Sequence, residues 1–200
     1  MTVYFHGSFG LNREYMAGVL ATSLKNPDAS GDDIAAPFGY KAPFTGRYKS
    51  WLHKTGLTTK RRKTELTPVG EVVWEHDPKF ESVVTQWLMH HELCTDPERA
   101  EAWSFFANEF LPNRKSFGVE ELEDGLAMKL MGHHPSHFGR GAPMIKVIAR
   151  KIVQCYTQPE ALGPLGILAS SNGKTCKVHR TNQLGPWSST SALAKSYEKL

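Results

Sequence analysis

The sequence contains little cysteine, and its cysteines form no pattern typical of a disulfide framework. Cys94, Cys155 and Cys176 are the three cysteines in 200 residues, and no CxxC pair occurs. Small secreted domains that depend on disulfides have dense and even-numbered cysteine sets. The low, odd count therefore favours a reducing compartment, and we expect a cytoplasmic protein.

Long apolar runs are also missing. No stretch approaches the ~18 consecutive apolar residues that span a bilayer, and the first ten residues lack a charged segment followed by an apolar one. We therefore expect neither a membrane span nor a secretory signal. Hydrophobic residues make up 40% and charged residues 22% of the sequence, which is ordinary globular composition. A chain of this length can bury roughly 70% of its unfolded surface without disulfides or metals.

Acidic residues are absent from one segment and concentrated in the next. Residues 41–64 contain eight Lys and Arg residues and no Asp or Glu. Residues 65–124 contain fourteen acidic and four basic residues, and residues 125–200 contain two acidic and ten basic residues. Charge blocks often form solvated faces, so segregation alone identifies no partner. A basic block that coincides with a DNA-binding pattern favours nucleic acid.

The basic block carries the periodicity of a helix-turn-helix. A short helix capped by Asp32 or Asp33 precedes a tight turn at Gly39, and a second helix runs from about Pro43 to Lys54. Proline suits the first turn of a helix, and glycine suits a tight turn because it adopts positive φ. The second helix has apolar and small side chains at helical spacing, which predicts a buried face of Phe44, Tyr48, Trp51, Leu52 and Thr55.

A hairpin with a basic tip follows this helix. Gly56 ends the helix, and residues 57–59 (LTT) and 64–67 (TELT) predict two short strands. This order of elements is typical of a winged helix-turn-helix, here over residues 31–70, whose second helix has the width to enter a major groove. Winged helices also bind proteins, but the absence of acid favours double-stranded DNA. The residues expected to contact DNA are Lys41, Thr45, Arg47, Lys49, His53, Lys54, Lys60, Arg61, Arg62 and Lys63.

These residues have different expected roles. Arg61, Arg62 and Lys63 lie at the hairpin tip, where they suit the phosphate backbone. Thr45, Lys49 and His53 share the outer face of the second helix, so they are candidates for contacts with base edges.

The rest of the chain predicts more helices and a second hairpin. Asp77 and Asp96 each precede a proline, which is typical of an acidic N-cap. A helix is expected over Val119–Met131 and another after Pro143, and the sequence Ser-Asn-Gly at 171–173 is typical of a hairpin turn. This hairpin leaves open a second winged-helix-like unit. Its expected DNA contacts are Lys146, Arg150, Lys151, Lys174 and Lys177.

The predicted fold class is mainly α with short β-hairpins. We expect an N-terminal winged helix-turn-helix over residues 1–76 and a helical domain with a basic C-terminal hairpin over residues 77–182. Residues 183–200 are serine-rich and are expected to form a tail.

Five motifs resemble a known family. They are residues 5–9 (FHGSF), 66–71 (LTPVGE), 86–93 (QWLMHHEL), 102–110 (AWSFFANEF) and 164–168 (PLGIL). Together they resemble the SspB type of protein, from bacterial Ssp DNA phosphorothioation systems, over roughly residues 3–180. The third and fourth motifs are the most specific.

The resemblance implies a role in DNA modification and phage defence. In such systems a non-bridging phosphate oxygen of one DNA strand is replaced by sulfur. The SspB-type protein is held to nick DNA and to work with a cysteine desulfurase, an ATPase and an ATP-dependent sulfur-transfer enzyme. This chain is shorter than many relatives, so a function carried by an extra region elsewhere is in doubt.

The sequence offers few candidate residues for DNA cleavage. Phosphodiester hydrolysis usually needs carboxylates or histidines that hold a metal ion, such as Mg²⁺ or Mn²⁺, and an activated water. Asp77 and Lys79 have D-x-K spacing, and His90 and Cys94 have i, i+4 ligand spacing. A histidine cluster is formed by His133, His134 and His137. Each set also has a structural explanation: a helix cap for Asp77, a packed histidine for His90 and an exposed loop for the histidine cluster. The cysteines could carry a persulfide, but burial in the core explains them as well. The sequence assigns no catalytic residue and no metal ligand.

Two functions of different classes remain. One is a metal-dependent nickase that prepares DNA for sulfur insertion. The other is a non-catalytic subunit that recognises DNA and recruits the sulfur-transfer enzymes, with the acidic segment as the partner surface. A transcription regulator is a third hypothesis, but the helical middle is larger than such a protein needs.

Overall fold

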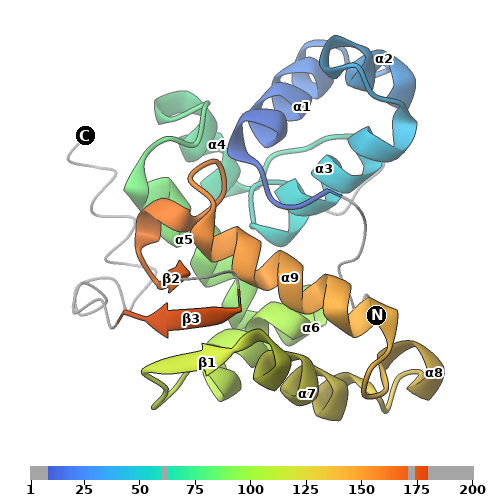
Figure 1. Ribbon diagram of the computed structural model, residues 1–200. Coiled ribbons are helices and arrows are strands. Elements are labelled where there is room, and N and C mark those ends of the chain that lie inside the picture. The colour runs from blue at the N-terminus through green and yellow to red at the C-terminus, as the bar shows by residue number, and fades with distance from the viewer. Residues whose placement is uncertain (1–8, 60–62, 171–173, 180–200) are drawn as a thin grey trace.

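The protein is described by a computed structural model, which covers residues 9–59, 63–170 and 174–179. Over these ranges it is mainly helical with a small antiparallel sheet (Figure 1), as the composition and periodicity predict. The elements in chain order are α1 (Arg13–Lys25), α2 (Gly31–Ala35), η1 (Ala36–Phe38), α3 (Ala42–Lys54), α4 (Pro68–His76), α5 (Val83–Thr95), α6 (Pro97–Phe105), η2 (Phe106–Phe110), β1 (Ser116–Gly118), α7 (Val119–Leu130), α8 (Pro135–Phe138), α9 (Pro143–Thr157), η3 (Gly163–Leu165), β2 (Leu168–Ser170) and β3 (Thr175–Val178).

The first three helices pack against one another at one side of the molecule (Figure 1). The predicted caps of α2 are wrong: Ser30 is the N-cap, and Asp33 completes a capping box three residues later. Asp32 has a different role, because its Oδ1 accepts a hydrogen bond from the backbone N–H of Ala42 at 2.9 Å. Asp32 therefore satisfies a free N–H at the start of α3 and fixes the angle between α2 and α3.

Helix α3 buries the predicted face. Phe44, Tyr48, Trp51 and Leu52 are each at most 2% exposed, and Phe44 stacks on Tyr40 with ring centroids 4.6 Å apart. Aromatic pairs of this kind add to the stability that area burial provides. The turn that precedes the helix requires Gly39, whose φ is 73°, as predicted.

The hairpin after α3 is paired at its base. Thr58 and Leu66 form an antiparallel bridge, and the N–H of Thr59 donates to the carbonyl of Glu65 at 2.9 Å. The two predicted strand segments therefore pair, through one isolated bridge among the residues described and not through a regular ladder. Most of the basic tip, residues 60–62, lies outside the described residues.

One of the two acidic caps is confirmed. Asp96 is the N-cap of α6 and accepts from the backbone N–H of Glu98. The prediction for Asp77 is wrong, because Asp77 follows the end of α4 and no helix begins at Pro78. The Asp77 carboxylate accepts from the backbone N–H groups of Glu81 and Ser82, and it thereby shapes the loop before α5.

Helices α7 and α9 agree closely with the sequence. Helix α7 ends one residue earlier than predicted and buries Leu122, Leu126 and Leu130. Helix α9 begins at Pro143 and buries Ile148 and Ile152. Both patterns are local and repeat at helical period, which is why the sequence predicts them. Figure 1 shows α9 crossing the molecule, with α7 and β1 on one side of it.

The sheet has the strand order β1-β3-β2. Strands β2 and β3 pair antiparallel with Leu168 opposite Val178, as a hairpin requires, while the predicted turn at 171–173 lies outside the described residues. Strand β1 is not predicted from the sequence. It pairs with β3, with Phe117 opposite Cys176, and both side chains are buried.

One hydrophobic core runs through the described part of the chain. Trp51 of α3 meets Trp103 of α6 edge-to-face at 5.4 Å, and the ammonium of Lys54 donates to the carbonyl of Arg99. The segments on the two sides of the expected domain boundary, between residues 76 and 77, therefore share one core. The boundary itself stays a prediction. Within the described ranges, none of the helices has the length and apolarity needed to cross a bilayer.

Candidate nucleic-acid interface

Helix α3 and its N-cap carry three of the predicted basic residues. Lys41 and Arg47 are exposed, and Lys49 is half-buried. Burial lowers the pKa of Lys49. These three cations lie in a segment without a single carboxylate, so the sequence places no acidic neighbour on α3 itself. The arrangement suits a polyanion.

Two residues predicted to contact DNA are buried instead. Thr45 is 3% exposed, and its Oγ1 donates to the carbonyl of Gly31 at 2.7 Å. Lys54 is also 3% exposed, and its ammonium donates to the carbonyl of Arg99. The prediction is wrong for both, because α2 packs over the first residue and α6 covers the second.

His53 is partly committed to the fold. Its Nδ1 lies 3.1 Å from the carbonyl oxygen of Thr58, and the side chain is half-buried. The ring therefore ties the end of α3 to the base of the hairpin. Its contact with base edges stays a prediction.

A hollow of about 640 Å³ separates α3 and the hairpin from the loop that joins α1 to α2. Lys49 and Lys63 line it from one side, and Asp28 lines it from the other. Lys63 forms an exposed ion pair with Asp28, with Nζ and Oδ1 2.7 Å apart. The hydrogen bond from Lys63 lowers the pKa of Asp28. Asp28 thus occupies one position that a phosphate would take beside Lys63.

The second basic set lies on α9 and the β2–β3 hairpin. Lys146, Arg150, Lys174 and Lys177 are exposed, and Lys151 is half-buried. The pKa of Lys151 is lowered by burial and by the charge of Arg150. Lys146, Arg150 and Lys174 line one cleft, whereas Lys151 lies beside Gly10 in the N-terminal part of the chain. The contact of these residues with DNA stays a prediction.

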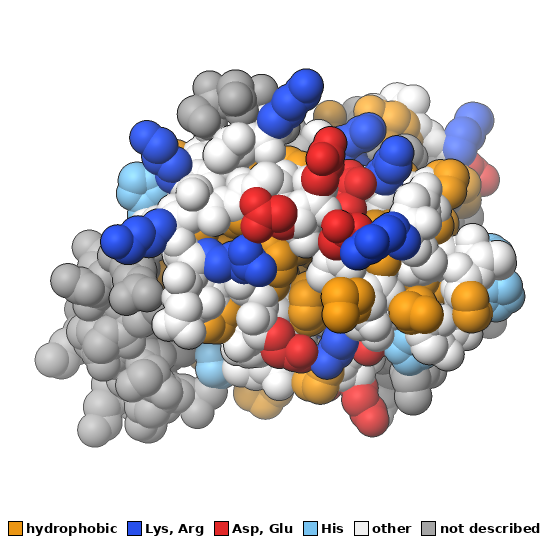
Figure 2. Space-filling view, turned by 60° about the horizontal axis from the view of Figure 1, so that its bottom comes forward, with side chains coloured by type: hydrophobic (Ala, Val, Ile, Leu, Met, Phe, Trp, Pro, Cys, Tyr) orange, Lys and Arg blue, Asp and Glu red, His pale blue; other side chains and the backbone are white. Residues whose placement is uncertain are grey.

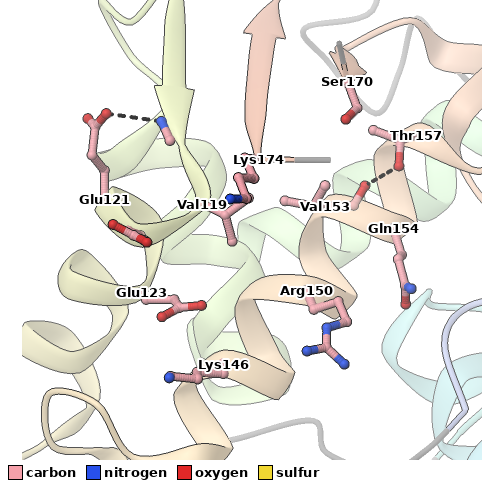
Figure 3. A pocket seen from close by; sticks show the side chains of 12 residues that line it. Val119, Glu121, Glu123, Lys146, Arg150, Val153, Gln154, Thr157, Ser170 and Lys174 are labelled. Atoms are coloured by element: carbon pink, nitrogen blue, oxygen red, sulfur yellow. Dashed lines mark hydrogen bonds between the residues drawn. The ribbon is translucent and has the colours of Figure 1, made fainter. Parts of the chain in front are cut away.

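A cleft of about 720 Å³ lies between α7, α9 and this hairpin (Figure 3), and we call it the α9 cleft. The residues that matter to its chemistry are Glu120, Glu123, Lys146, Arg150, Gln154 and Lys174. The glutamates come from the first turns of α7 and face the cations of α9 across the cleft. Figure 2 shows this side of the molecule, on which Lys and Arg side chains surround a group of carboxylates.

Another carboxylate of α7 is held in place. Glu121 accepts from the backbone N–H of Gly118 and from the Arg114 guanidinium, both at 3.0 Å. Gly118 is the N-cap of α7, so the bond from its N–H to Glu121 is the half of a capping box that a glycine allows. The Glu121 carboxylate is therefore committed to the start of the helix.

The His90 and Cys94 pair is a packed pair. The Nδ1 of His90 lies 2.8 Å from the Tyr156 hydroxyl and 3.5 Å from the Cys94 sulfur. Burial lowers the pKa of His90 to about 4 and raises the pKa of Cys94 to about 12. At neutral pH both groups are uncharged, so neither acts as a cation or as a thiolate.

The other cysteines are equally unreactive. Cys155 and Cys176 are at most 1% exposed. Burial raises the pKa of both thiols, to about 12 for Cys155. A buried thiol with a raised pKa is a poor nucleophile. These observations support the burial explanation for all three cysteines over the persulfide explanation.

The histidine loop does not assemble a metal site in the structure. His133 pairs with Glu101 at 3.0 Å, while the rings of His134 and His137 meet edge-to-face at 4.3 Å. Among the residues that the structure describes, no three His, Cys, Asp or Glu side chains gather in a way that could hold a metal ion. These residues do not fit a Mg²⁺ or Mn²⁺ centre.

Residues 47–161 match the model of a family described as protein of unknown function, DUF4007. The chain belongs to the DUF4007 family. Two solved structures also resemble it. A magnesium ion-bound SspB crystal structure has a TM-score of 0.62 and 18% identity, and a second SspB crystal structure has 0.61 and 17%. Each match covers 87% of this chain and 58% of the SspB chain. No curated protein matches the sequence.

The likeness confirms that this DUF4007 chain is SspB-like, as the sequence motifs predict, and it does so at the level of the fold. The chain spans 58% of the length of the SspB chains. The part of SspB outside the match has no counterpart in this comparison. The activity of a whole SspB protein therefore does not transfer with the fold.

The sequence did not predict the side of the α9 cleft that α7 forms in this DUF4007 chain. Glu120 and Glu123, whose charges also suit the N-terminal end of the α7 dipole, are not among the predicted site residues, yet they line the α9 cleft. Gln154 was also missed. Its distance of four residues from Arg150 was the available signal, because residues at i and i+4 share a helix face.

Proposed function

We propose that this DUF4007 chain is the DNA-binding component of a DNA phosphorothioation defence system. Its N-terminal module, α1 to α3 with the hairpin at residues 57–67, acts as a winged helix-turn-helix on double-stranded DNA. One observation carries the proposal: α3 and its N-cap carry exposed Lys41 and Arg47 and half-buried Lys49 in a segment that contains no acid. The SspB-like fold supports the assignment to this type of system.

The dimensions of α3 suit a major groove. An α-helix with its side chains is about 10–12 Å in diameter, and the groove is about 12 Å wide. The 13 residues of α3 give it a length of about 20 Å along the groove. Arg47 and Lys63 are placed to neutralise phosphates, which releases counterions and makes the affinity depend on salt. Lys49 lies one turn before His53 on α3 and lines the hollow beside the helix, and it stays our candidate for contact with a base edge.

The acidic segment supplies a surface of the opposite sign. We assign residues 65–124, with four basic and fourteen acidic residues, to contacts with other proteins of the system. The expected partners are a cysteine desulfurase, an ATPase and a sulfur-transfer enzyme. Repulsion would keep this segment away from DNA, so it stays accessible when DNA is bound.

Metal-dependent nicking is the second candidate function. The observation in its favour is that one of the solved relatives is a magnesium ion-bound SspB structure. The described residues of this chain offer no group of ligands that fits such a metal, so we derive no hydrolytic step. DNA recognition with recruitment of the sulfur-transfer enzymes remains the function that the residues support best.

One experiment tests both candidates. Purified protein is titrated onto supercoiled plasmid with Mg²⁺, with Mn²⁺ and with EDTA, and both binding and the appearance of open circles are measured. Salt-dependent binding without nicking supports the recognition function. Open circles that require metal support nicking.

A matched pair of variants shows whether the N-terminal module is responsible. Arg47→Ala with Lys49→Ala should weaken binding and reduce the slope of log K against log salt by about 0.9, since Arg47 is the expected phosphate contact of the pair and each lost phosphate contact contributes about 0.9. Lys79→Ala removes an exposed cation outside α3 and should leave both unchanged. Equal behaviour of the double variant and the wild type would contradict the proposal.

A further inference from the structure

The connectivity of the C-terminal part repeats a known DNA-binding arrangement. Helix α6 and the short η2 are followed by β1, α7, the four-residue α8, α9, the short η3 and the β2–β3 hairpin, and the strand order is β1-β3-β2. Apart from the short elements η2, α8 and η3, this order matches that of a winged helix: helix, strand, two helices and a hairpin whose last strand pairs with the first strand. In this scheme α9 is the recognition helix and the hairpin is the wing.

Helix α9 presents a polar stripe on its cleft side. Lys146, Arg150 and Gln154 follow one another at intervals of four residues, and Thr157 continues the row. Side chains at this spacing share a helix face, and the row extends over about 16 Å at 1.5 Å per residue. The opposite face holds buried Ile148 and Ile152. The stripe is therefore an outward face that the core does not use.

The chemistry of the stripe fits duplex DNA. Arg150 can donate two hydrogen bonds to a guanine edge, and Gln154 can pair with an adenine edge. Lys146 at the start of α9 and Lys174 beside the hairpin lie on either side of them, where phosphates flank a groove (Figure 3). All four side chains line the same cleft.

The carboxylates on the α7 side of the cleft favour DNA on the side of α9 and the hairpin. Glu120 and Glu123 line the α9 cleft from α7, and Figure 3 shows Glu123 across the cleft from Arg150 of α9. A DNA phosphate near these carboxylates would be repelled, whereas a phosphate on the α9 and hairpin side would be attracted. Removing the carboxylates and removing the cations should therefore change the affinity in opposite directions.

We propose that the α9 cleft is a second duplex-contacting surface, in which α9 reads bases and Lys146 and Lys174 hold the backbone. The proposal rests on the proposed DNA-binding function. It adds a second recognition helix to that function. A protein partner of mixed charge is the competing occupant.

The test measures duplex affinity over a range of salt by fluorescence anisotropy, and the length of the hydroxyl-radical footprint. Lys146→Ala with Arg150→Ala should weaken binding about ten-fold or more, lower the salt slope by about 0.9 for the phosphate contact of Lys146 and shorten the footprint. Glu120→Gln with Glu123→Gln should tighten binding and steepen the slope. The exchange Lys146→Arg with Arg150→Lys keeps both charges, so it should retain the slope and lose sequence preference. Circular dichroism checks that each variant folds.

The outcomes separate the two proposals. If the α9 variant binds like the wild type while Arg47→Ala with Lys49→Ala binds weakly, the second surface is refuted and the DNA-binding function stands. If the wild type does not bind DNA, both proposals fail. If the α9 variant keeps its DNA affinity but loses a partner of the sulfur-transfer system, the cleft is a protein site and the inference is overturned.

Discussion

Arg13 joins the N-terminal module to the rest of the molecule. Its guanidinium donates to the carbonyls of Phe80 at 2.7 Å, Pro159 at 2.6 Å and Ala161 at 2.7 Å. The three acceptors lie in two loops far from α1 in the sequence. Burial lowers the pKa of Arg13, whereas nearby carboxylates raise it, and an arginine remains charged in any case.

The loss expected for Arg13→Ala follows from these contacts. A hydrogen bond to a charged group contributes about 1.5–3 kcal/mol when buried. Arg13 is partly exposed, so we discount each bond to about 1 kcal/mol because water can replace part of it. Three bonds give about 3 kcal/mol of the free energy of unfolding. For a chain of this length, that corresponds to a decrease in Tm of about 6–12 °C.

Urea unfolding followed by tryptophan fluorescence and by circular dichroism measures this loss. Arg13→Lys is the matched variant, because an ammonium keeps the charge but cannot reach three carbonyls in a fixed fork; it should recover less than half of the loss. Lys79 and Arg13 line one surface hollow, and Lys79→Ala should change the free energy of unfolding by less than about 0.5 kcal/mol. A loss below about 1 kcal/mol in Arg13→Ala would refute the role of Arg13 as a clamp.

Three further predictions concern charge. Asp28→Asn removes the carboxylate that pairs with Lys63 and should tighten DNA binding by a few-fold, as measured by anisotropy; weaker binding would show that the ion pair orders the hairpin. Alanine at all three basic positions 61–63 should lower the affinity for every DNA sequence alike and reduce the salt slope by up to about 2.7; a change in sequence preference instead would contradict phosphate contact. Because the pKa of His90 is about 4 when folded and near 6.5 when unfolded, its contribution to stability should be complete above pH 6.5 and decrease toward pH 4. His90→Gln should flatten the pH dependence of unfolding, and an unchanged pH profile would mean that His90 is not the titrating group.

The elements that the sequence predicts well are those with local causes. The buried face of α3, the length of α7 and the start of α9 follow from side chains that are close in the sequence. The N-cap at Asp96 follows from two adjacent residues. Such patterns are complete within about 15 residues, so they can be read without knowing what packs against them.

The features that the sequence missed depend on distant partners. Strand β1 is three residues long, and it forms because β3, more than 50 residues later, offers hydrogen bonds to it. Asp77 has the neighbours of an N-cap, but the chain turns at buried Phe80 before the next helix starts. The α9 cleft likewise exists only when α7 and the hairpin meet beside α9.

Lys54 allows a test of the contrast between what the local sequence indicates and what distant partners determine. Its position on α3 and its place in the basic segment both indicate a DNA contact, yet α6 covers it and its ammonium donates to the Arg99 carbonyl. Lys54→Met keeps the length of the side chain and removes the charge. We expect DNA affinity and salt slope to stay unchanged. The free energy of unfolding should change by no more than about 2 kcal/mol, because the lost hydrogen bond is offset by removing a buried cation.

Arg47→Met is the matched variant, since it removes one positive charge from the exposed side of the same helix. It should weaken DNA binding and lower the salt slope by about 0.9 while leaving stability nearly unchanged. Net charge falls by one in both variants, so any difference between them reports the position of the charge. If both variants lost affinity equally, binding would depend on the overall charge of the chain, and α3 would not be the surface that docks on DNA.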